Sequence, residues 1–230
     1  MKYTYHFDRE ACWYKQVCGK YSTSECDRGC VRYIKMHFLV TNALLTNKQQ
    51  GLTKLKPEKI DLKKFSRLNE IKNSIVDFVN TGKNLCIYSN NNGNGKTEWS
   101  IKLILRYLSE IWHRDSFTVR AIFINVTRLL NACKDNISTK SDYLKHIKEH
   151  IFDCDIVIWD DIGIKGLTSY EHDILYNYIN YRIDAGKSNI YTANTIGENF
   201  SGMVGDRLYS RIVNCSEIIE FNGSDRRGVL

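Results

Sequence analysis

The sequence predicts an α/β protein in which helices cover both faces of a parallel sheet, preceded by a small cysteine-rich module. Three observations predict it. From Arg67 onward short apolar runs alternate with longer amphipathic stretches, one of the apolar runs leads into a glycine-containing polar loop, and four of the eight cysteines crowd into residues 12–30. Alternating strands and helices are typical of a three-layer αβα fold.

Five apolar segments are predicted as strands, and two amphipathic segments between them as helices. The strands are expected at residues 84–89, 119–126, 155–159, 188–193 and 217–221. The helices are expected at residues 96–112 and 169–184, because apolar side chains recur there every three or four positions. The first helix places Ile101, Ile104, Leu105, Leu108 and Trp112 on one stripe, and the second Ile174, Leu175, Tyr178, Ile179 and Ile183.

Composition divides the chain into three regions. Residues 1–38 hold the cysteine-rich module, residues 39–66 are predicted as a basic linker with local helix, and residues 67–230 form the α/β domain. Pro57 makes one long helix across the linker unfavourable, because proline removes a backbone donor and clashes with the preceding turn.

Charge is placed unevenly along the chain. The net charge is +7, and residues 1–80 carry 15 Lys and Arg against 8 Asp and Glu, whereas residues 81–230 carry 18 of each. A basic segment beside a neutral body suggests a docking surface for an acidic partner or for nucleic acid. A solvated basic linker is the alternative interpretation.

Composition also excludes several classes of protein. A hydrophobic content of 43% excludes a wholly disordered chain. No apolar run approaches the ~18 residues that a membrane helix needs, and the N-terminal MKYTYHFDRE has no apolar stretch of signal-peptide length. We therefore expect a cytoplasmic protein that does not enter a membrane.

The polar loop has the composition of a phosphate-binding loop. Segment 89–97 reads SNNNGNGKT and runs directly into the helix expected at residue 96. In such loops backbone N–H groups and the helix N-terminus point at phosphate oxygens, and glycines avoid side chains that would obstruct the anion. Lys96 would reach the β- and γ-phosphates, and the Thr97 hydroxyl would bind Mg²⁺. The predicted ATP or ADP site comprises Asn90, Gly93, Asn94, Gly95, Lys96 and Thr97.

The match to the consensus GxxxxGK[ST] departs at one position. Asn90 stands where the consensus has its first glycine. Asparagine tolerates the left-handed backbone conformation better than most residues, so the substitution weakens the match without breaking it. The alternative interpretation is a polar turn, because Asn-Gly is a common hairpin signal. The apolar helix that follows GNGKT favours phosphate binding over a hairpin.

Two acidic residues end the third apolar strand. In the run IVIWDD, Asp160 and Asp161 follow four apolar residues and come some sixty residues after the loop. The carboxyl ends of parallel strands share one edge of the sheet, so these carboxylates are expected beside the phosphate-binding loop. Asp160 would hold Mg²⁺, and Asp161 would orient or deprotonate the attacking water. Two solvated carboxylates at a strand end are the alternative.

The ordered motifs GNGKT, DIVIWDDIG, NIYTANT and RLYSRI resemble one group of proteins. They are similar to the AAA+ ATPases of the helicase-loader group, which includes the DnaC and DnaI proteins, their phage counterparts and the transposition helper IstB. The resemblance covers roughly residues 68–230. It implies a P-loop AAA+ fold without a full helical lid, weak ATP hydrolysis, and self-association into an AAA+ oligomer. It also implies a hexameric replicative helicase and single-stranded DNA as partners, in phage or bacterial DNA replication.

The resemblance also assigns roles to polar residues outside the loop. Asn194 in YTANT matches the sensor position, where an amide can contact a γ-phosphate and position water. Arg211 in LYSRI matches the arginine finger, which acts on nucleotide bound to the neighbouring subunit. Arg207, four residues earlier, is the alternative finger. Arg227 matches the second sensor position, with Arg226 as its alternative.

The crowded cysteines provide enough thiolates for a tetrahedral zinc site. They are Cys12, Cys18, Cys26 and Cys30, and their spacing departs from the common C-x2-C knuckle. Loaders of the DnaI type carry a comparable module, so the resemblance implies zinc here as well. His6 or His37 could replace one thiolate. A small hydrophobic cluster of reduced cysteines is the alternative.

Three functions are compatible with these features. The first is an ATP-dependent loader of a replicative helicase. The second is an IstB-like transposition helper that acts on duplex DNA with a transposase. The third is a non-hydrolysing adaptor that binds ATP for folding alone, an option that Asn90 keeps open.

Overall fold

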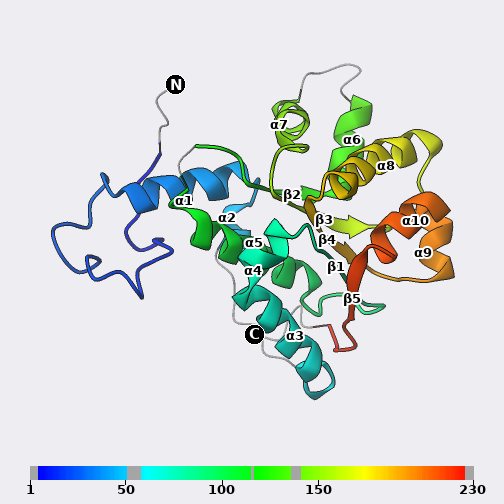
Figure 1. Cartoon of the computed structure of the whole chain (residues 1–230), viewed down its shortest axis with the longest axis horizontal. Helices are drawn as coiled ribbons and strands as arrows, with labels where there is room; N and C mark the ends of the chain where they lie inside the picture. Colours follow the sequence, from blue (N-terminus) through cyan, green and yellow to red (C-terminus); the bar gives the residue numbers. More distant parts are fainter. Residues whose placement is uncertain (1–4, 51–57, 115–116, 136–140, 226–230) are drawn as a thin grey trace.

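The computed structural model describes residues 5–50, 58–114, 117–135 and 141–225. Pro57 lies outside these ranges, as do Arg226 and Arg227. Within them no helix has the length and apolar character needed to cross a membrane. Figure 1 shows one layered α/β body, with the N-terminal residues projecting from one end.

A parallel sheet of five strands forms the centre of the body, which confirms the predicted fold class (Figure 1). The strands are β1 (Asn84–Tyr88), β2 (Ala121–Asn125), β3 (Ile156–Ile162), β4 (Ser188–Ala193) and β5 (Ser216–Glu220). Their order is β2-β3-β4-β1-β5, and all neighbours are parallel. The strand that precedes the polar loop and the strand that carries the acidic pair therefore flank β4.

Helices cover both faces of the sheet. They are α1 (Val31–Asn42), α2 (Asn47–Gln50), α3 (Leu62–Asn73), α4 (Ile75–Asn80), α5 (Lys96–Ile111), α6 (Val126–Asp135), α7 (Asp142–His150), α8 (Ser169–Asp184), α9 (Glu198–Val204) and α10 (Asp206–Val213), with a 3-10 turn, η1 (Lys59–Asp61), before α3. Helices α1, α3, α4 and α5 pack on one face, and α6 to α10 on the other. Alternation along β3 sends Ile156 and Ile158 to the first face and Val157 and Trp159 to the second.

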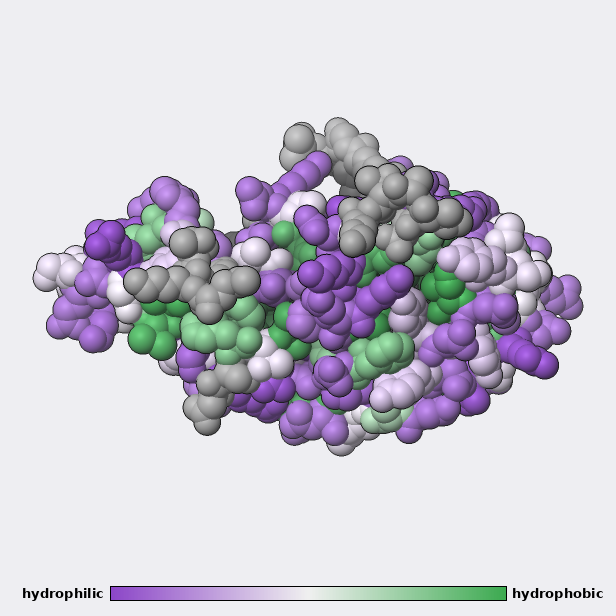
Figure 2. Space-filling model, turned by 90° about the horizontal axis from the view of Figure 1, so that it is seen from above, coloured by the Kyte–Doolittle hydropathy of each residue, from purple (hydrophilic) through white to green (hydrophobic). Residues whose placement is uncertain are grey.

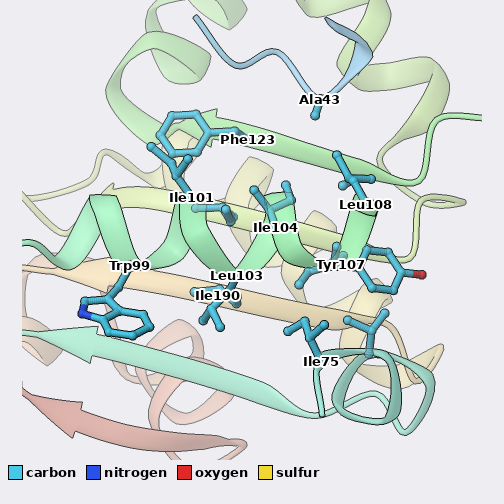
Figure 3. Close-up of a cluster of buried hydrophobic side chains, with 14 of the residues drawn as sticks. Ala43, Ile75, Trp99, Ile101, Leu103, Ile104, Tyr107, Leu108, Phe123 and Ile190 are labelled. Carbon is cyan, nitrogen blue, oxygen red and sulfur yellow. The ribbon is translucent and has the colours of Figure 1, made fainter. Parts of the chain in front are cut away.

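Helix α5 is the centre of the first core layer (Figure 3). Of the predicted stripe, Ile101, Ile104 and Leu108 are almost completely buried, whereas Leu105 and Trp112 are only partly buried. In Figure 3, Ile190 of β4 lies below this helix and Phe123 of β2 lies above it. Ile75 of α4 packs near the end of the helix that carries Tyr107. This packing fixes the first turn of α5, which carries Lys96 and Thr97, relative to the sheet.

Residues 39–66 differ from the expected linker where the structure describes them. Helix α1 crosses residue 38, and Val40 and Ala43 are completely buried. The carbonyl of Ala43 accepts a hydrogen bond of 2.8 Å from the N–H of Phe123 on the edge strand β2. Phe65, at the start of α3, packs edge-on against Trp99 of α5. The apolar residues of this segment are thus part of the core, while domain boundaries at residues 38 and 66 stay a prediction.

The cysteine-rich residues form a smaller lobe that contacts the end of α5. The Tyr14 hydroxyl donates to the carbonyl of Ser109 at 3.1 Å. The guanidinium of Arg32 lies 3.5 Å from the ring centre of Tyr14 and 5.1 Å from that of Trp112. Figure 2 shows the lobe at the left, where hydrophobic residues come to the surface. Val17 is 76% exposed and Val31 60% exposed, so this lobe presents apolar as well as basic side chains to solvent.

Candidate nucleotide-binding site

The polar loop joins β1 to α5, as a phosphate-binding loop requires. Ser89 is completely buried, and its hydroxyl accepts hydrogen bonds from the N–H of Asn91, at 3.0 Å, and from the side-chain amide of Asn94. The N–H of Ser89 donates to the carbonyl of Ala193 at the end of β4. Ser89 therefore ties the start of the loop to the centre of the sheet.

Lys96 is folded back onto the loop. It is only 7% exposed, and its Nζ donates to the carbonyl oxygens of Asn91, at 3.1 Å, and Ser89, at 3.4 Å. An ammonium group inside a loop of this shape is placed to exchange carbonyl partners for phosphate oxygens.

Two glycines of the loop have backbone angles that other residues avoid. Gly93 has φ of 68° and Gly95 has φ of 102°. A Cβ atom at Gly93 would lie 1.6 Å from a carboxylate oxygen of Asp225, so a side chain there would collide with the C-terminal segment. Among the described non-glycine residues, only Leu44 and Asp161 have positive φ. Asn90 therefore needs no glycine-like conformation, and the departure from the consensus costs no backbone strain.

Thr97 and Asp160 meet at the carboxyl edge of the sheet. The Thr97 hydroxyl donates a hydrogen bond of 2.8 Å to Oδ1 of Asp160. Burial, and next the charge of Asp161, raise the pKa of Asp160 from 3.8 to about 6, against hydrogen bonds from Thr97, Thr192 and Asn125 that lower it. A hydroxyl and a carboxylate are the hard oxygen ligands that Mg²⁺ prefers, so these two residues fit the metal that the sequence predicts.

Asp161 lies beside Asp160 in an irregular part of β3. The sequence predicts the end of this strand at Trp159, but the strand continues to Ile162 with a register shift against β4 between those two residues. Asp161 has φ of 61°, and its N–H donates to the Thr192 hydroxyl at 2.9 Å.

The remaining site residues, which the resemblance assigns, lie outside both the phosphate-binding loop and the acidic strand β3. Asn194 directly follows β4, between the loop strand β1 and the acidic strand β3. Arg207 is exposed and Arg211 half-buried, both on α10. Neither arginine forms an ion pair within the described residues, and their role as an arginine finger stays a prediction. Arg226 and Arg227 lie outside the described residues.

Three polar residues at the site belong to none of the motifs that predict it. Ser89 organises the loop, Asn125 at the end of β2 is a hydrogen-bond donor to Asp160, and Thr192 contacts both aspartates. Each is the polar residue at or near the carboxyl end of a predicted strand. That position was the available signal, but pairing the residues with the acidic strand required the strand order.

The C-terminal segment after β5 crosses beside the loop. Asp61 of η1 is completely buried, and its carboxylate accepts the N–H groups of Asn222, at 3.0 Å, and Gly223, at 2.8 Å. The Gly223 carbonyl in turn accepts the side-chain amide of Asn91 at 3.2 Å. The loop, the residues before α3 and the C-terminal segment are thus connected.

The four clustered cysteines converge but do not form a metal site as placed. All four line one small cavity in the N-terminal lobe; they are Cys12, Cys18, Cys26 and Cys30. Burial, and to a lesser extent the neighbouring thiols, raise the pKa of Cys12. His6 and His37 are not among the residues that line the cavity. In the part of the chain that the structure describes, no three His, Cys, Asp or Glu side chains are arranged to hold a metal ion.

The arrangement of loop, lysine and aspartates agrees with the family to which the sequence is similar. A model of the IstB-like ATP binding protein family matches residues 29–228. The chain belongs to this family. The match begins before α1, so it includes the helices that pack on α5 as well as the sheet.

Solved structures with the same fold include proteins of DNA replication. The DnaC helicase loader is 17% identical, with a TM-score of 0.52 over 73% of this chain and 93% of that chain. A putative primosome component from Streptococcus pyogenes serotype M3 is 16% identical, with a TM-score of 0.58 over 83% of this chain and 98% of that chain. The replication initiator DnaA bound to AMPPCP and single-stranded DNA is 17% identical, with a TM-score of 0.56 over 78% of this chain and 51% of that chain. No curated protein is significantly similar in sequence.

These comparisons confirm the P-loop AAA+ fold and the ATP-binding family that the motifs indicate. At such low identities the structural likeness concerns the fold alone.

Proposed function

We propose that this member of the IstB-like family is an ATP-binding and ATP-hydrolysing loader of a replicative DNA helicase. The observation that carries the nucleotide part is the 2.8 Å hydrogen bond between Thr97 and Asp160, which joins the loop to the acidic strand. The loader part is supported by the fold of the DnaC helicase loader, which this chain matches over 93% of that protein. Such a role belongs in the cytoplasm of a bacterium, whether the gene is bacterial or phage-borne.

In this proposal each residue of the site has one task. Lys96 and the loop N–H groups bind the phosphates, while Thr97 and Asp160 hold Mg²⁺. When bound, the metal neutralises charge on the transferred phosphoryl group. Asp161 orients the attacking water.

The residues assigned by resemblance complete the site. Asn194 contacts the γ-phosphate. Arg211, or Arg207 in its place, acts on the nucleotide of a neighbouring subunit, which requires self-association on the helicase. Arg227 is assigned to the second sensor position by resemblance alone.

Hydrolysis is tested by comparing the wild-type chain with Asp161→Asn, with and without single-stranded DNA. We expect wild-type hydrolysis to exceed that of the variant by about 100-fold or more, because a group that positions the nucleophile contributes on that scale. ATP affinity should be equal in the two proteins. Equal and negligible rates would favour the non-hydrolysing adaptor.

Binding of single-stranded DNA and of the helicase is supported by fold and charge. The DnaA structure of the same fold is described as bound to single-stranded DNA. Residues 1–80 carry the whole net positive charge. We therefore assign the basic N-terminal segment, the lobe together with the residues that follow it, first to the partner protein and second to DNA. Tagged full-length protein purified from the native host should retain a replicative helicase, identified by mass spectrometry.

A transposition helper is the second candidate, favoured by the name of the matching family, IstB-like ATP binding protein. The same purification separates the two roles. Recovery of a transposase in place of a helicase would overturn the loader proposal.

Zinc in the N-terminal lobe is a further part of the proposal. It is supported by the convergence of Cys12, Cys18, Cys26 and Cys30 on one cavity, since four thiolates suit Zn²⁺. Their sulfur atoms would have to come closer together to bind it, because no metal-holding group is formed among the described residues. Elemental analysis of the purified protein should find about one zinc per chain. If the protein is purified without zinc and all four thiols react freely, that result would contradict the zinc site.

A further inference from the structure

The acidic strand carries a β-bulge at the two aspartates. Trp159 pairs with Tyr191 and Ile162 pairs with Ala193, with a register shift between them. Two residues of β3, Asp160 and Asp161, therefore lie opposite one residue of β4. A bulge of this kind leaves one residue without a ladder partner and changes the direction of its side chain.

The single residue opposite the bulge is Thr192, and its hydroxyl contacts both aspartates. It accepts the N–H of Asp161 at 2.9 Å and donates to Oδ1 of Asp160 at 2.8 Å. Thr192 is completely buried. The hydroxyl thus supplies the acceptor that a regular ladder would have offered to the Asp161 N–H.

The bulge places Asp161 in a conformation that side chains rarely adopt. Its φ of 61° is in the left-handed region, where an L-residue other than glycine is strained and persists only if its surroundings hold it. The hydrogen bond from its N–H to Thr192 is such a restraint.

Thr192 also shares an acceptor with the phosphate-binding loop. Oδ1 of Asp160 receives the hydroxyls of Thr97 and Thr192, each at 2.8 Å. Two donors to the same oxygen restrict the rotation of this carboxylate. Thr97 belongs to the loop and Thr192 to the sheet, so the carboxylate is aligned between the two.

We propose that Thr192 is a positioning residue, whose hydroxyl holds the bulge in β3 and thereby aims Asp160 and Asp161 at the Mg²⁺-nucleotide. The inference rests on the proposed nucleotide site. It adds a group that contacts neither metal nor nucleotide and acts through the two carboxylates.

The test compares Thr192→Val, which keeps the shape and removes the hydroxyl, with Thr192→Ser, which restores the hydroxyl. Thr195→Val is the matched control: it removes a hydroxyl just beyond the same strand, whose hydrogen bond is to the carbonyl of Ile196. The readout is the affinity for a fluorescent ATP analogue, measured with and without Mg²⁺, together with kcat and KM and a thermal melt.

Mg²⁺ increases the affinity for nucleotide, and we compare the Mg²⁺ concentration that gives half of this increase. For Thr192→Val we expect this concentration to be at least about tenfold higher than for the wild type, as for other residues that orient metal ligands. Its Mg²⁺-free affinity should equal that of the wild type, because Lys96 and the loop are intact. Its kcat should fall much more than its KM rises. Thr192→Ser should restore both properties, and Thr195→Val should leave them unchanged.

An unchanged Mg²⁺ response in folded Thr192→Val would overturn the proposal, and so would failure of Thr192→Ser to restore it. If Thr192→Val does not fold, Thr192→Ala replaces it in the comparison. If neither Thr192→Val nor Thr192→Ala folds while Thr192→Ser does, the role of Thr192 is purely structural. That result would also overturn the proposal. Wild-type protein that shows no Mg²⁺-dependent nucleotide binding would overturn the proposed function itself, a result distinct from all of these.

Discussion

At the scale of single residues, Asp160 lies in an environment that disfavours the ionised form of its carboxyl group. Its carboxyl is 5% exposed and lies beside Asp161, and its pKa is raised to about 6. Bound Mg²⁺ would reverse this penalty, because a cation favours the ionised carboxylate. The ligand-free protein therefore carries a local instability that ligand binding removes.

Asp160→Asn should stabilise the ligand-free protein while it removes the metal ligand. A carboxyl whose pKa is raised by folding, from 3.8 to about 6, binds its proton more tightly in the folded state. Its destabilising effect is absent below about pH 4, grows as the pH rises to about 6 and is complete above that value. At pH 7.5 we expect the free energy of unfolding of the variant, measured with urea, to be higher by on the order of 3 kcal/mol.

The same variant should lose the Mg²⁺-dependent part of ATP affinity. In the wild type that part should fall as the pH drops through about 6, because the protonated carboxyl does not bind the metal. A variant that is less stable than the wild type at pH 7.5, or a wild-type Mg²⁺ response that is flat from pH 5 to 8, would contradict this account of Asp160.

At the scale of secondary-structure elements, local patterns predicted most of the sheet. The expected strands agree with β1, β2, β4 and β5 to within two residues, since each is a short apolar run. The expected helix at 169–184 agrees fully with α8, which begins with a capping box between Thr168 and Glu171.

The elements that the sequence pattern does not predict depend on distant contacts. Helix α1 has buried residues at helical spacing, but its place in the core follows from packing on α5 and β2. The bulge in β3 could not be predicted, because it is defined by the register against β4. Lys96, Thr97, Asp160 and Asp161 are predicted from local motifs, whereas the place of Thr192 beside the two aspartates depends on the register between β3 and β4.

Asp61→Ala tests the connection between η1 and the C-terminal segment. The change leaves the N–H groups of Asn222 and Gly223 without their acceptor in the interior, so we expect a loss of about 2–3 kcal/mol in urea unfolding. ATP affinity should also fall, because Gly223 contacts Asn91 of the loop. The control Asp77→Ala changes an exposed carboxylate and should have little effect.

Stability of Asp61→Ala equal to that of the control would show that the C-terminal segment is not anchored by this carboxylate.

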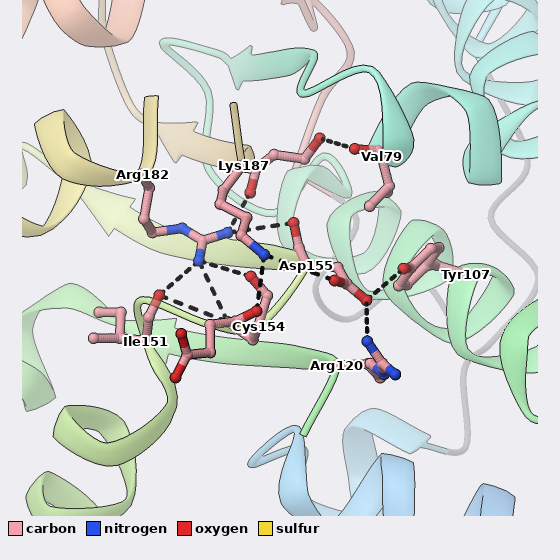
Figure 4. A network of polar contacts seen from close by, with 10 residues as sticks. Val79, Tyr107, Arg120, Ile151, Cys154, Asp155, Arg182 and Lys187 are labelled. Atoms are coloured by element: carbon pink, nitrogen blue, oxygen red, sulfur yellow. Dashed lines mark hydrogen bonds and ion pairs between the residues drawn. The ribbon is translucent and has the colours of Figure 1, made fainter. Parts of the chain in front are cut away.

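At the scale of the whole molecule, a polar network holds the edge of the sheet opposite the nucleotide site (Figure 4). Arg182 of α8 is completely buried and donates to the carbonyls of Ile151, Cys154 and Ser188 at 2.6, 3.0 and 2.8 Å, and to Asn189 at 2.9 Å. Ile151 and Cys154 lie in the turn between α7 and β3, and Ser188 and Asn189 lie at the start of β4, so the network joins α8 to the segments that lead into both strands.

Arg182→Ala should destabilise the fold by about 3 kcal/mol or more, because it leaves several buried acceptors without a donor. Because the network lies at the opposite edge of the sheet, the folded fraction should keep wild-type affinity for Mg²⁺-ATP. Urea unfolding and nucleotide titration measure the two effects separately. A large loss of affinity in fully folded Arg182→Ala would instead show that the two edges of the sheet are coupled.

At the same scale, part of the basic N-terminal third belongs to the core of the molecule. Val40, Ala43 and Phe65 belong to the core, so a deletion of residues 1–66 would remove packing from α5 as well as the docking surface. Charge changes on exposed residues of the lobe, such as Lys15→Glu with Arg28→Glu, leave this core intact. They should weaken helicase binding without changing ATP affinity.

The proposed function depends on binding of Mg²⁺-ATP by the loop between β1 and α5. Isothermal titration of ATP into the full-length protein in the presence of Mg²⁺, for the wild type and for Lys96→Ala, tests it most directly. We expect saturable binding to the wild type that weakens when Mg²⁺ is removed, and no measurable binding to folded Lys96→Ala. Absence of binding to the wild type, or equal binding to both proteins, would contradict it.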